Sequence, residues 1–392
     1  MLKPDHARKE RTSLPERVNT NPDAGTYEPT HYQRDSSNDI TFESVFTYPN
    51  LYKSYRKCRR QVGWKHSTQA YKANACVNIR KTQKELLSGK WKSKGFIEFD
   101  IMERGKKRHI KSVHISERVV QRCLCDYCLT PLLGRSLIPD NSASQKDKGM
   151  DYALRRLTRQ LQQHYRKYGT EGYILQFDFH KFFESVDHEA VFRLLDRKVK
   201  DKRLRDLTKY LVKMFGVRGL GLGSQVSQNI AVAIPDHLDH IIKERFHIRG
   251  YGRYMDDGYA ISHDKETLRK VLDAIRKESA LFGVEINEKK TQIVKLSHGF
   301  TFLKIKFSIT ETGRIVKRLS RTNVTRERRK LKKLAKMVPP DDLKASFTSW
   351  KGHASRCRSH RTQQAMKEVY DKCMQISTDR NTPSTASSQK TE

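Results

Sequence analysis

The sequence lacks long apolar runs, and it has few cysteines for its length. Its longest apolar stretches fall far short of the roughly 20 residues that a membrane-spanning helix needs. The N-terminal segment MLKPDHARKE carries no apolar stretch of the kind found in a secretory signal. The 7 cysteines among 392 residues are too sparse for a disulfide scaffold. We therefore expect a cytoplasmic protein with reduced thiols and no membrane partner.

Acidic residues are also scarce relative to basic ones. Lys and Arg number 79 against 44 Asp and Glu, which gives a formal net charge of +35 at pH 7. An excess of this size is usually matched by the phosphate backbone of a nucleic acid. Charge alone does not distinguish an enzyme from a coat or ribosomal protein.

Composition and periodicity divide the chain into segments. Residues 1–42 and 376–392 are polar and follow neither a helical nor a strand period, so we expect them to be disordered. Helical and strand patterns are mixed between these ends, which indicates an α+β fold. Within this part, boundaries near residues 170 and 310 separate a mainly helical first section, a section with several buried strands and a basic last section.

The basic last section contains an unusual run of charge. Residues 314–336 hold eleven Lys or Arg and one acid, too one-sided for salt bridges within the run. A solvated helix face is one interpretation, and a surface that follows phosphates is the one we favour. The residues expected to contact nucleic acid are Arg328, Arg329, Lys332 and Lys333.

Three acidic residues stand out because the chain is so basic. Asp178 ends an apolar strand, and Asp256 and Asp257 adjoin each other at a tight turn between two short strands. Each has a plain structural interpretation, a strand-end cap for Asp178 and a polar hairpin turn for the pair. A turn needs only one such residue, however, and two like charges this close repel unless a cation is present.

Together the three carboxylates fit one mechanism. Two divalent ions about 4 Å apart can clamp the attacking and leaving oxygens of a phosphoryl transfer. Hard oxygen ligands favour Mg²⁺, with Mn²⁺ as an alternative. The sequence therefore predicts a catalytic site with two ions at Asp178, Asp256 and Asp257.

The order of these motifs resembles that of bacterial reverse transcriptases. The strand with Asp178 is followed by LGSQVSQ and then by YMDD, and ERVVQRCLCDYCLTPLL, NSASQKDKGMDYALRRL and EINEKKTQIVKLSHGFTFLKIKF extend the resemblance over roughly residues 45–310. The resemblance implies a right-hand polymerase fold and an RNA-directed DNA polymerase that uses a template RNA and dNTPs and produces cDNA. The fingers and the start of the palm would be residues 43–170, the palm 171–310 and a basic helical thumb 311–375.

The resemblance also assigns site residues. Asp178, Asp256 and Asp257 match the metal ligands of the family, with the carbonyl of Phe179 as a further ligand. Phe183 matches the aromatic residue that lies under the sugar and excludes a 2′-hydroxyl, although either Phe182 or Phe183 could instead belong to the core. The segments that hold the incoming triphosphate match at Arg108, Lys111, Lys146 and Lys148, any of which could also be an ordinary surface cation.

The glycine-loop motif narrows the resemblance. Most reverse transcriptases read Gln-Gly-x-x-x-Ser-Pro, whereas this chain has Leu222 and Gly223 at the start and Gln228 at the end. This variant resembles the enzymes of diversity-generating retroelements, which copy RNA with frequent errors opposite adenine. These three residues are then expected to contact the nucleotide, and a small accessory protein is a further candidate partner. The alternative is that Leu222 is only a packed loop residue.

Other functions stay open. A retron-like, phage-defence or group II-derived reverse transcriptase would share the same catalytic motifs. A non-catalytic, maturase-like RNA-binding protein is a further alternative, although it would gain nothing from clustered acids facing a polyanion. In each case we expect a bacterial or phage-encoded protein of the cytoplasm.

Overall fold

The computed structural model describes residues 40–381, apart from residue 61 and residues 104–105. The disorder expected for residues 1–39 and 382–392 lies outside the described residues. The first helix, α1, spans Phe42–Val45, and the hydroxyl of Thr41 caps it by accepting a hydrogen bond from the Ser44 amide at 3.2 Å. Phe42 is buried in the core and Ile40 packs against it, so the disorder expected up to residue 42 does not hold for residues 40–42.

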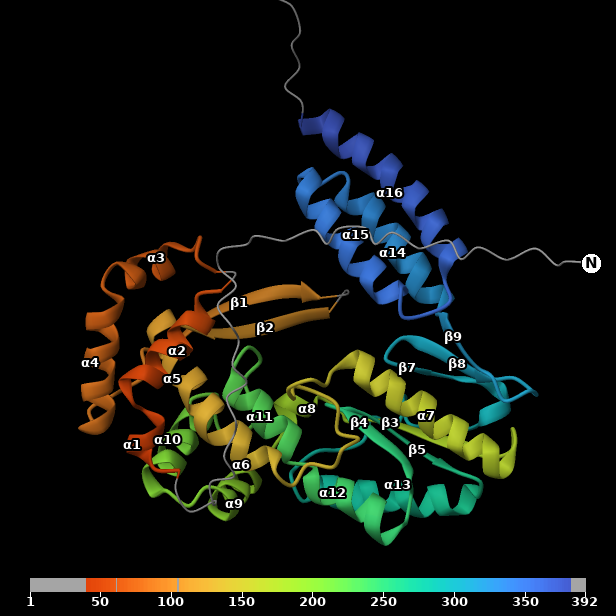
Figure 1. The fold of residues 1–392 in the computed structure, drawn as a ribbon, viewed down its shortest axis with the longest axis horizontal. Helices are drawn as coiled ribbons and strands as arrows, with labels where there is room; N and C mark the ends of the chain where they lie inside the picture. Colours follow the sequence, from red (N-terminus) through yellow and green to blue (C-terminus); the bar gives the residue numbers. More distant parts are fainter. Residues whose placement is uncertain (1–39, 61, 104–105, 382–392) are drawn as a thin grey trace, which may run out of the picture. The chain divides into compact units, whose positions relative to one another are not determined.

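The N-terminal third combines helices with one hairpin. Its elements are α2 (Tyr48–Cys58), α3 (His66–Ala73), α4 (Ala75–Leu87), β1 (Phe96–Glu103), β2 (Lys106–Val113), α5 (Ile115–Leu124) and α6 (Thr130–Gly134). Strands β1 and β2 pair in antiparallel fashion, beginning with Phe96 opposite Val113. Figure 1 shows the hairpin extending from the helices. On α5, Val119, Cys123 and Leu124 are buried at helical spacing, which places one face of the helix in the core.

An antiparallel sheet of four strands forms the centre of the chain. It consists of β3 (Tyr173–Asp178), β4 (Gly250–Tyr254), β5 (Asp257–Ser262) and β6 (Gln292–Lys295), in the order β4-β5-β3-β6. Side chains alternate between its two faces. Ile174 and Ile261 pack with α7 (Met150–Tyr168), whereas Leu175 and Ala260 belong to the core that includes α13 (Lys265–Ala280).

The helices between β3 and β4 complete the larger core. They are α8 (Phe182–Ser185), α9 (His188–Lys198), α10 (Lys202–Lys213), α11 (Gln225–Ala233) and α12 (Asp236–His240). Pro235 separates α11 from α12, because proline cannot donate the helical backbone hydrogen bond. No helix within the described residues is long and apolar enough to span a membrane.

The C-terminal part differs from expectation at both of its boundaries. A second sheet contains β7 (Phe300–Phe302), β8 (Ile305–Ile309) and β9 (Ile315–Leu319), so the boundary expected at residue 310 falls between two paired strands. Three helices follow, α14 (Arg321–Leu334), α15 (Pro340–Ala354) and α16 (His360–Asn381). Residues 376–381 are therefore helical rather than disordered. Ser377 anchors this last turn, because its buried hydroxyl donates to the Val338 carbonyl at 3.0 Å.

Candidate active site

Strand register brings the three predicted carboxylates to one end of the four-stranded sheet. Asp178 is the last residue of β3, Asp257 is the first residue of β5, and the two lie directly opposite each other in the antiparallel pair. Asp256 precedes Asp257 in the turn that joins β4 to β5. Antiparallel pairing therefore gathers residues that are nearly eighty positions apart in the chain.

The turn between β4 and β5 has a demanding backbone geometry. Met255 adopts a φ of 57°, in the left-handed region that side chains other than glycine rarely occupy. Directly after the two acids, a Cβ at Gly258 would lie 2.1 Å from the Cζ atom of Phe177, so only glycine fits beside this ring. Met255 and Gly258 thus flank Asp256 and Asp257 with constraints that fix where the two acids lie.

Electrostatics confirm that the carboxylates crowd one another. Burial, followed by the charges of Asp256 and Asp178, raises the pKa of Asp257 to about 7. Burial and the charge of Asp178 also raise the pKa of Asp256, although Lys290 and Arg108 oppose that effect. Such shifts mark a place where negative charge is concentrated and where a cation would be stabilised.

Two residues that the sequence analysis did not assign bind Asp178 directly. The ammonium of Lys290 donates to Asp178 Oδ2 at 2.6 Å, and the Asn287 side-chain amide donates to the same oxygen at 3.1 Å. Burial opposes the charge of Lys290, but its hydrogen bond to Asp178 and the nearby carboxylates raise its pKa above the usual value. The Asn287 amide N–H also donates to the Asp178 carbonyl at 2.7 Å, which fixes the end of β3.

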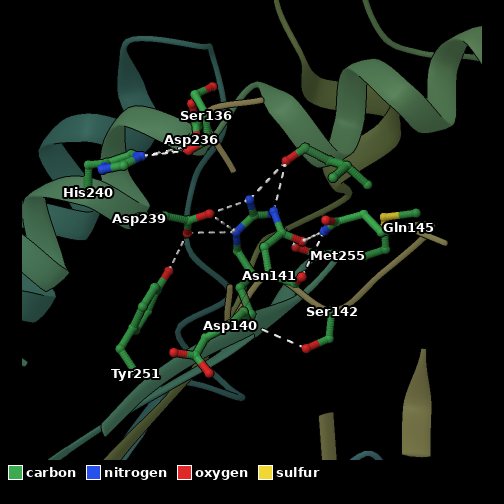
Figure 2. Close-up of polar contacts among 12 residues, drawn as sticks. Ser136, Asp140, Asn141, Ser142, Gln145, Asp236, Asp239, His240, Tyr251 and Met255 are labelled. Carbon is green, nitrogen blue, oxygen red and sulfur yellow. Dashed lines mark hydrogen bonds and ion pairs between the residues drawn. The ribbon is translucent and has the colours of Figure 1, made fainter. Parts of the chain in front are cut away.

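A buried arginine holds the turn from behind. Arg253 on β4 and Asp239 on α12 form an ion pair at 2.6 Å with neither side chain exposed. The remaining guanidinium protons donate to the carbonyls of Met255 at 3.0 Å and Val232 at 2.9 Å. Figure 2 also shows Tyr251, whose hydroxyl donates to Asp239 Oδ1 at 2.6 Å. The strained Met255 peptide is therefore tied to the rigid core.

The same arginine is also paired through its backbone. The Arg253 amide donates to the Asp140 carbonyl at 3.1 Å, and the Ser142 amide donates to the Arg253 carbonyl at 3.0 Å. Asp140 in turn accepts from Arg156 at 2.6 Å and from Lys243 at 2.8 Å. Figure 2 shows Asp140, Asn141 and Ser142 alongside this strand.

The donor set is suited to a divalent cation, although the carboxylates are not arranged around one. Among the described residues, no three His, Cys, Asp or Glu side chains stand together in a way that would hold a metal ion. Asp178, Asp256 and Asp257 nonetheless offer only hard oxygen atoms, and burial, followed by the neighbouring carboxylates, raises the pKa of Asp256 and of Asp257. The residues fit a metal site in which Lys290 now supplies part of the positive charge at Asp178.

The neighbouring phenylalanines divide between core and surface. Phe179 and Phe182 are buried and stack with ring centroids 5.3 Å apart. Phe183 is half-buried and meets Phe182 edge-on at 5.9 Å. Of the two residues considered for the position under the sugar, the structure thus leaves Phe183 accessible and places Phe182 in the core.

The glycine loop contacts the β1–β2 hairpin. The Lys111 amide donates to the Leu222 carbonyl at 3.4 Å, and a Cβ at Gly223 would lie 3.3 Å from Ile110. Gly223 has a φ of 100°, Leu222 is half-buried, and Gln228 is exposed on α11. The backbone of Lys111 and the glycine loop are therefore adjacent, and their part in one nucleotide site stays a prediction.

The remaining predicted cations divide into two groups. Arg108 is exposed on β2, and its positive charge slightly opposes the rise in the pKa of Asp256 that burial and Asp178 cause. Lys148 instead donates to the carbonyls of Pro139 at 3.1 Å and Asn141 at 2.9 Å, and Lys146 is exposed nearby in the chain. Lys148 thus has a structural role in this conformation, which the sequence analysis did not anticipate.

Helix α14 carries the basic run on an exposed face. Leu331 is buried against α15 and α16, whereas the four predicted contact residues are exposed, namely Arg328, Arg329, Lys332 and Lys333. The one acid of the run, Glu327, pairs with Lys330 at 3.4 Å.

The antiparallel sheet with three carboxylates at one end is the arrangement of a nucleic-acid polymerase. Residues 92–307, more than half of the chain, match the family described as "Reverse transcriptase (RNA-dependent DNA polymerase)". The chain therefore belongs to the reverse transcriptase family, whose members are RNA-dependent DNA polymerases and thus nucleotidyltransferases. This confirms the expected family and the α+β right-hand polymerase fold, whereas the subtype stays a prediction.

The chain is also similar to a solved structure. Among solved structures, apo telomerase from Candida tropicalis, truncated from its C-terminal domain, is similar at a TM-score of 0.46 and 14% identity. The similarity covers 62% of this chain and 60% of that chain, so this chain spans about three fifths of the telomerase. A comparison with curated proteins gives no match.

Proposed function

We propose that the chain copies an RNA template into cDNA by two-metal nucleotidyl transfer and that it serves a diversity-generating retroelement. The observation that carries the polymerase part is the register of β3 and β5, which sets Asp178 opposite Asp257 with Asp256 adjacent. A clustered negative site in a chain of net charge +35 is costly unless it serves cations, and a polymerase active site requires them.

In this mechanism the chain's own residues position the reactants. Asp178, Asp256 and Asp257 would hold two Mg²⁺ ions, which supply charge stabilisation for the attacking 3′-hydroxyl and the leaving pyrophosphate. The Phe179 carbonyl is a further candidate ligand. Lys290 would release Asp178 as the cations are bound, since one oxygen of Asp178 now accepts from its ammonium.

The fingers residues would hold the triphosphate. Arg108 and Lys111 would both contribute positive charge to the nucleotide, and Lys111 would leave Glu98, whose carboxylate lies 3.5 Å from its ammonium. Lys146 and Lys148 would join them only if Lys148 left the carbonyls of Pro139 and Asn141.

Phe183 would set the choice of sugar. Its ring is half-buried on α8, immediately after β3, and it rests edge-on against the buried Phe182. A rigid ring under the sugar excludes a 2′-hydroxyl by a steric clash, which is discrimination against the wrong substrate. The product is then DNA rather than RNA.

The retroelement role rests on the Leu222 and Gln228 variant of the glycine loop. Leucine has neither a donor nor an acceptor in its side chain, whereas the glutamine of the common motif has both. Losing one hydrogen bond removes about 0.5–1.5 kcal/mol of preference for correct geometry. Since about 1.4 kcal/mol is tenfold in a rate ratio, misincorporation would rise measurably.

Sequencing of cDNA tests both parts of this proposal. Wild-type protein with Mg²⁺, dNTPs and a primed RNA of even composition should yield cDNA with errors concentrated opposite adenine, and Leu222→Gln should lower them. An error spectrum that is flat over the four template bases would move the assignment to a retron, phage-defence or group II-derived enzyme. Adenine-biased errors unchanged in Leu222→Gln would remove Leu222 as their cause.

A further inference from the structure

A basic pocket lies at the end of the four-stranded sheet opposite to the carboxylates. A pocket of about 560 Å³ opens there between α7, the end of β5 and the segment before β4. Its wall includes Ser262, which pairs with Tyr173 at the end of β3 and β5 opposite to Asp178 and Asp257. Because an extended strand rises about 3.4 Å per residue, the two ends lie about 17 Å apart. The pocket is therefore separate from the catalytic carboxylates.

The chemistry of the pocket is that of an anion site. Lys167 and Arg249 are exposed on its rim, and none of the described residues that line it carries a carboxylate. Burial lowers the pKa of His164, a further lining residue whose ring nitrogen lies 2.7 Å from the Glu171 carbonyl. The lysine and the arginine of the pocket wall are Lys167 and Arg249.

Flat rings form part of the same wall. Tyr168 stacks on His263 with centroids 4.7 Å apart and an interplanar angle of 11°, and His164 lies 5.0 Å from Tyr168 on the same helix. Lys167 extends over the Tyr168 ring at 5.0 Å, so the cation and the rings are adjacent. Cations that contact phosphates beside aromatic rings that stack on bases are the usual means of binding single-stranded nucleic acid.

We propose that this pocket binds a single-stranded segment of RNA, with Lys167 and Arg249 on its phosphates and the Tyr168–His263 rings against a base. The segment is distinct from the nucleotides being copied, since the pocket lies at the far end of the sheet. An RNA-dependent polymerase that binds its RNA at such a second site would keep the RNA bound while the copied part moves through the active site.

Salt-dependent binding tests the proposal. Lys167→Gln with Arg249→Gln removes two phosphate contacts, and each contact contributes about 0.7 to the slope of log K against log salt for a single strand. The slope for a long single-stranded RNA, measured by fluorescence anisotropy, should therefore fall by about 1.4. The matched control is Arg166→Gln with Lys270→Gln, which removes one arginine and one lysine from exposed positions outside the pocket lining. Equal slopes for the two variants would overturn the proposal and leave an acidic protein segment as the candidate occupant.

Further measurements separate this site from the active site. The charge-retaining variant Lys167→Arg with Arg249→Lys should keep the wild-type slope, and all three variants should extend a short primed template that ends within the active site. Ultraviolet crosslinking of the wild-type protein to RNA should also yield peptides crosslinked at Tyr168 or His263. Crosslinks confined to other peptides would contradict the proposal even if every variant folds.

Discussion

Replacing Arg253 by Met should destabilise the protein far more than the loss of an ordinary ion pair. The Arg253–Asp239 pair is fully buried, and the guanidinium also serves the carbonyls of Met255 and Val232. In Arg253→Met, the carboxylate of Asp239 stays buried with only the Tyr251 hydroxyl as its remaining partner among these hydrogen bonds. Breaking a buried pair in this way costs about 3–5 kcal/mol, a large part of a total stability of about 5–15 kcal/mol.

The assay is equilibrium unfolding in denaturant, with two comparison variants. Arg269→Met breaks an exposed pair with Glu266 and should cost about 0–1 kcal/mol. The double variant Arg253→Met with Asp239→Leu removes the orphaned charge and should recover more than half of the loss.

Catalysis provides a separate measure of the same arginine. The double variant folds without the donor that holds the Met255 carbonyl, so its kcat for primer extension should fall while its KM changes little. An Arg253→Met loss no larger than that of Arg269→Met, or a double variant with full kcat, would refute the claim that Arg253 holds the catalytic turn.

Three further predictions concern sugar choice, pH and the basic helix. Phe183→Ala should admit ribonucleotides in single-nucleotide extension, whereas Phe182→Ala should mainly destabilise the core; unchanged rNTP incorporation would place the sugar discrimination elsewhere. The pKa of Asp257 is about 7 in the folded protein and about 3.9 in the unfolded chain, so the folded state binds more protons between these two values. The metal-free protein should therefore lose stability as pH rises from about 4 to about 7. Thermal unfolding should show that loss in the wild type, with less of it in Asp257→Asn and after addition of Mg²⁺; a profile identical in Asp257→Asn would contradict the shift. The four exposed cations of α14 are Arg328, Arg329, Lys332 and Lys333. Their exchange for Ala should reduce the slope of log K against log salt for nucleic-acid binding by about 1 for each phosphate that is no longer neutralised. An unchanged slope would identify this face as merely solvated.

The sequence predicts the proximity of Asp178, Asp256 and Asp257 because their signals are local. Asp178 ends a run of mostly buried residues, and Asp256 and Asp257 lie where two short strands with buried interior residues meet. Antiparallel pairing of β3 with β5 then brings these residues together.

The partners of these residues were not predictable from local pattern. Lys290 is one of 79 cations, and nothing in the segment around it distinguishes an ammonium that reaches Asp178 over 112 positions of sequence. Arg253 could have been noticed, because it stands between apolar and small residues in a strand that is otherwise buried. Its partner Asp239 is on α12, and only the packing of that helix on the sheet brings the two together.

The two boundaries that differ from expectation in the C-terminal part also have physical causes. Lys317 and Arg318 give β9 a charged sequence that does not indicate a strand. Its pairing with β8 is a tertiary feature of the small sheet. The last turns of α16 have a polar sequence. Ser377 is nevertheless buried, because the segment after α14 packs against it. In both cases tertiary packing outweighs a composition that favours solvent.

The most direct test of the central claim is primer extension by Asp256→Ala with Asp257→Ala. Purified wild-type protein with Mg²⁺, dNTPs and a primed RNA should extend the primer, and the double variant should not, because it removes two of the three carboxylates that gather at the end of β3 and β5. The matched control is Asp273→Ala with Asp371→Ala, which removes the same number of carboxylates from exposed positions within α13 and α16. The account predicts extension by the wild type and the control alone; extension by the double variant at the wild-type rate would contradict it.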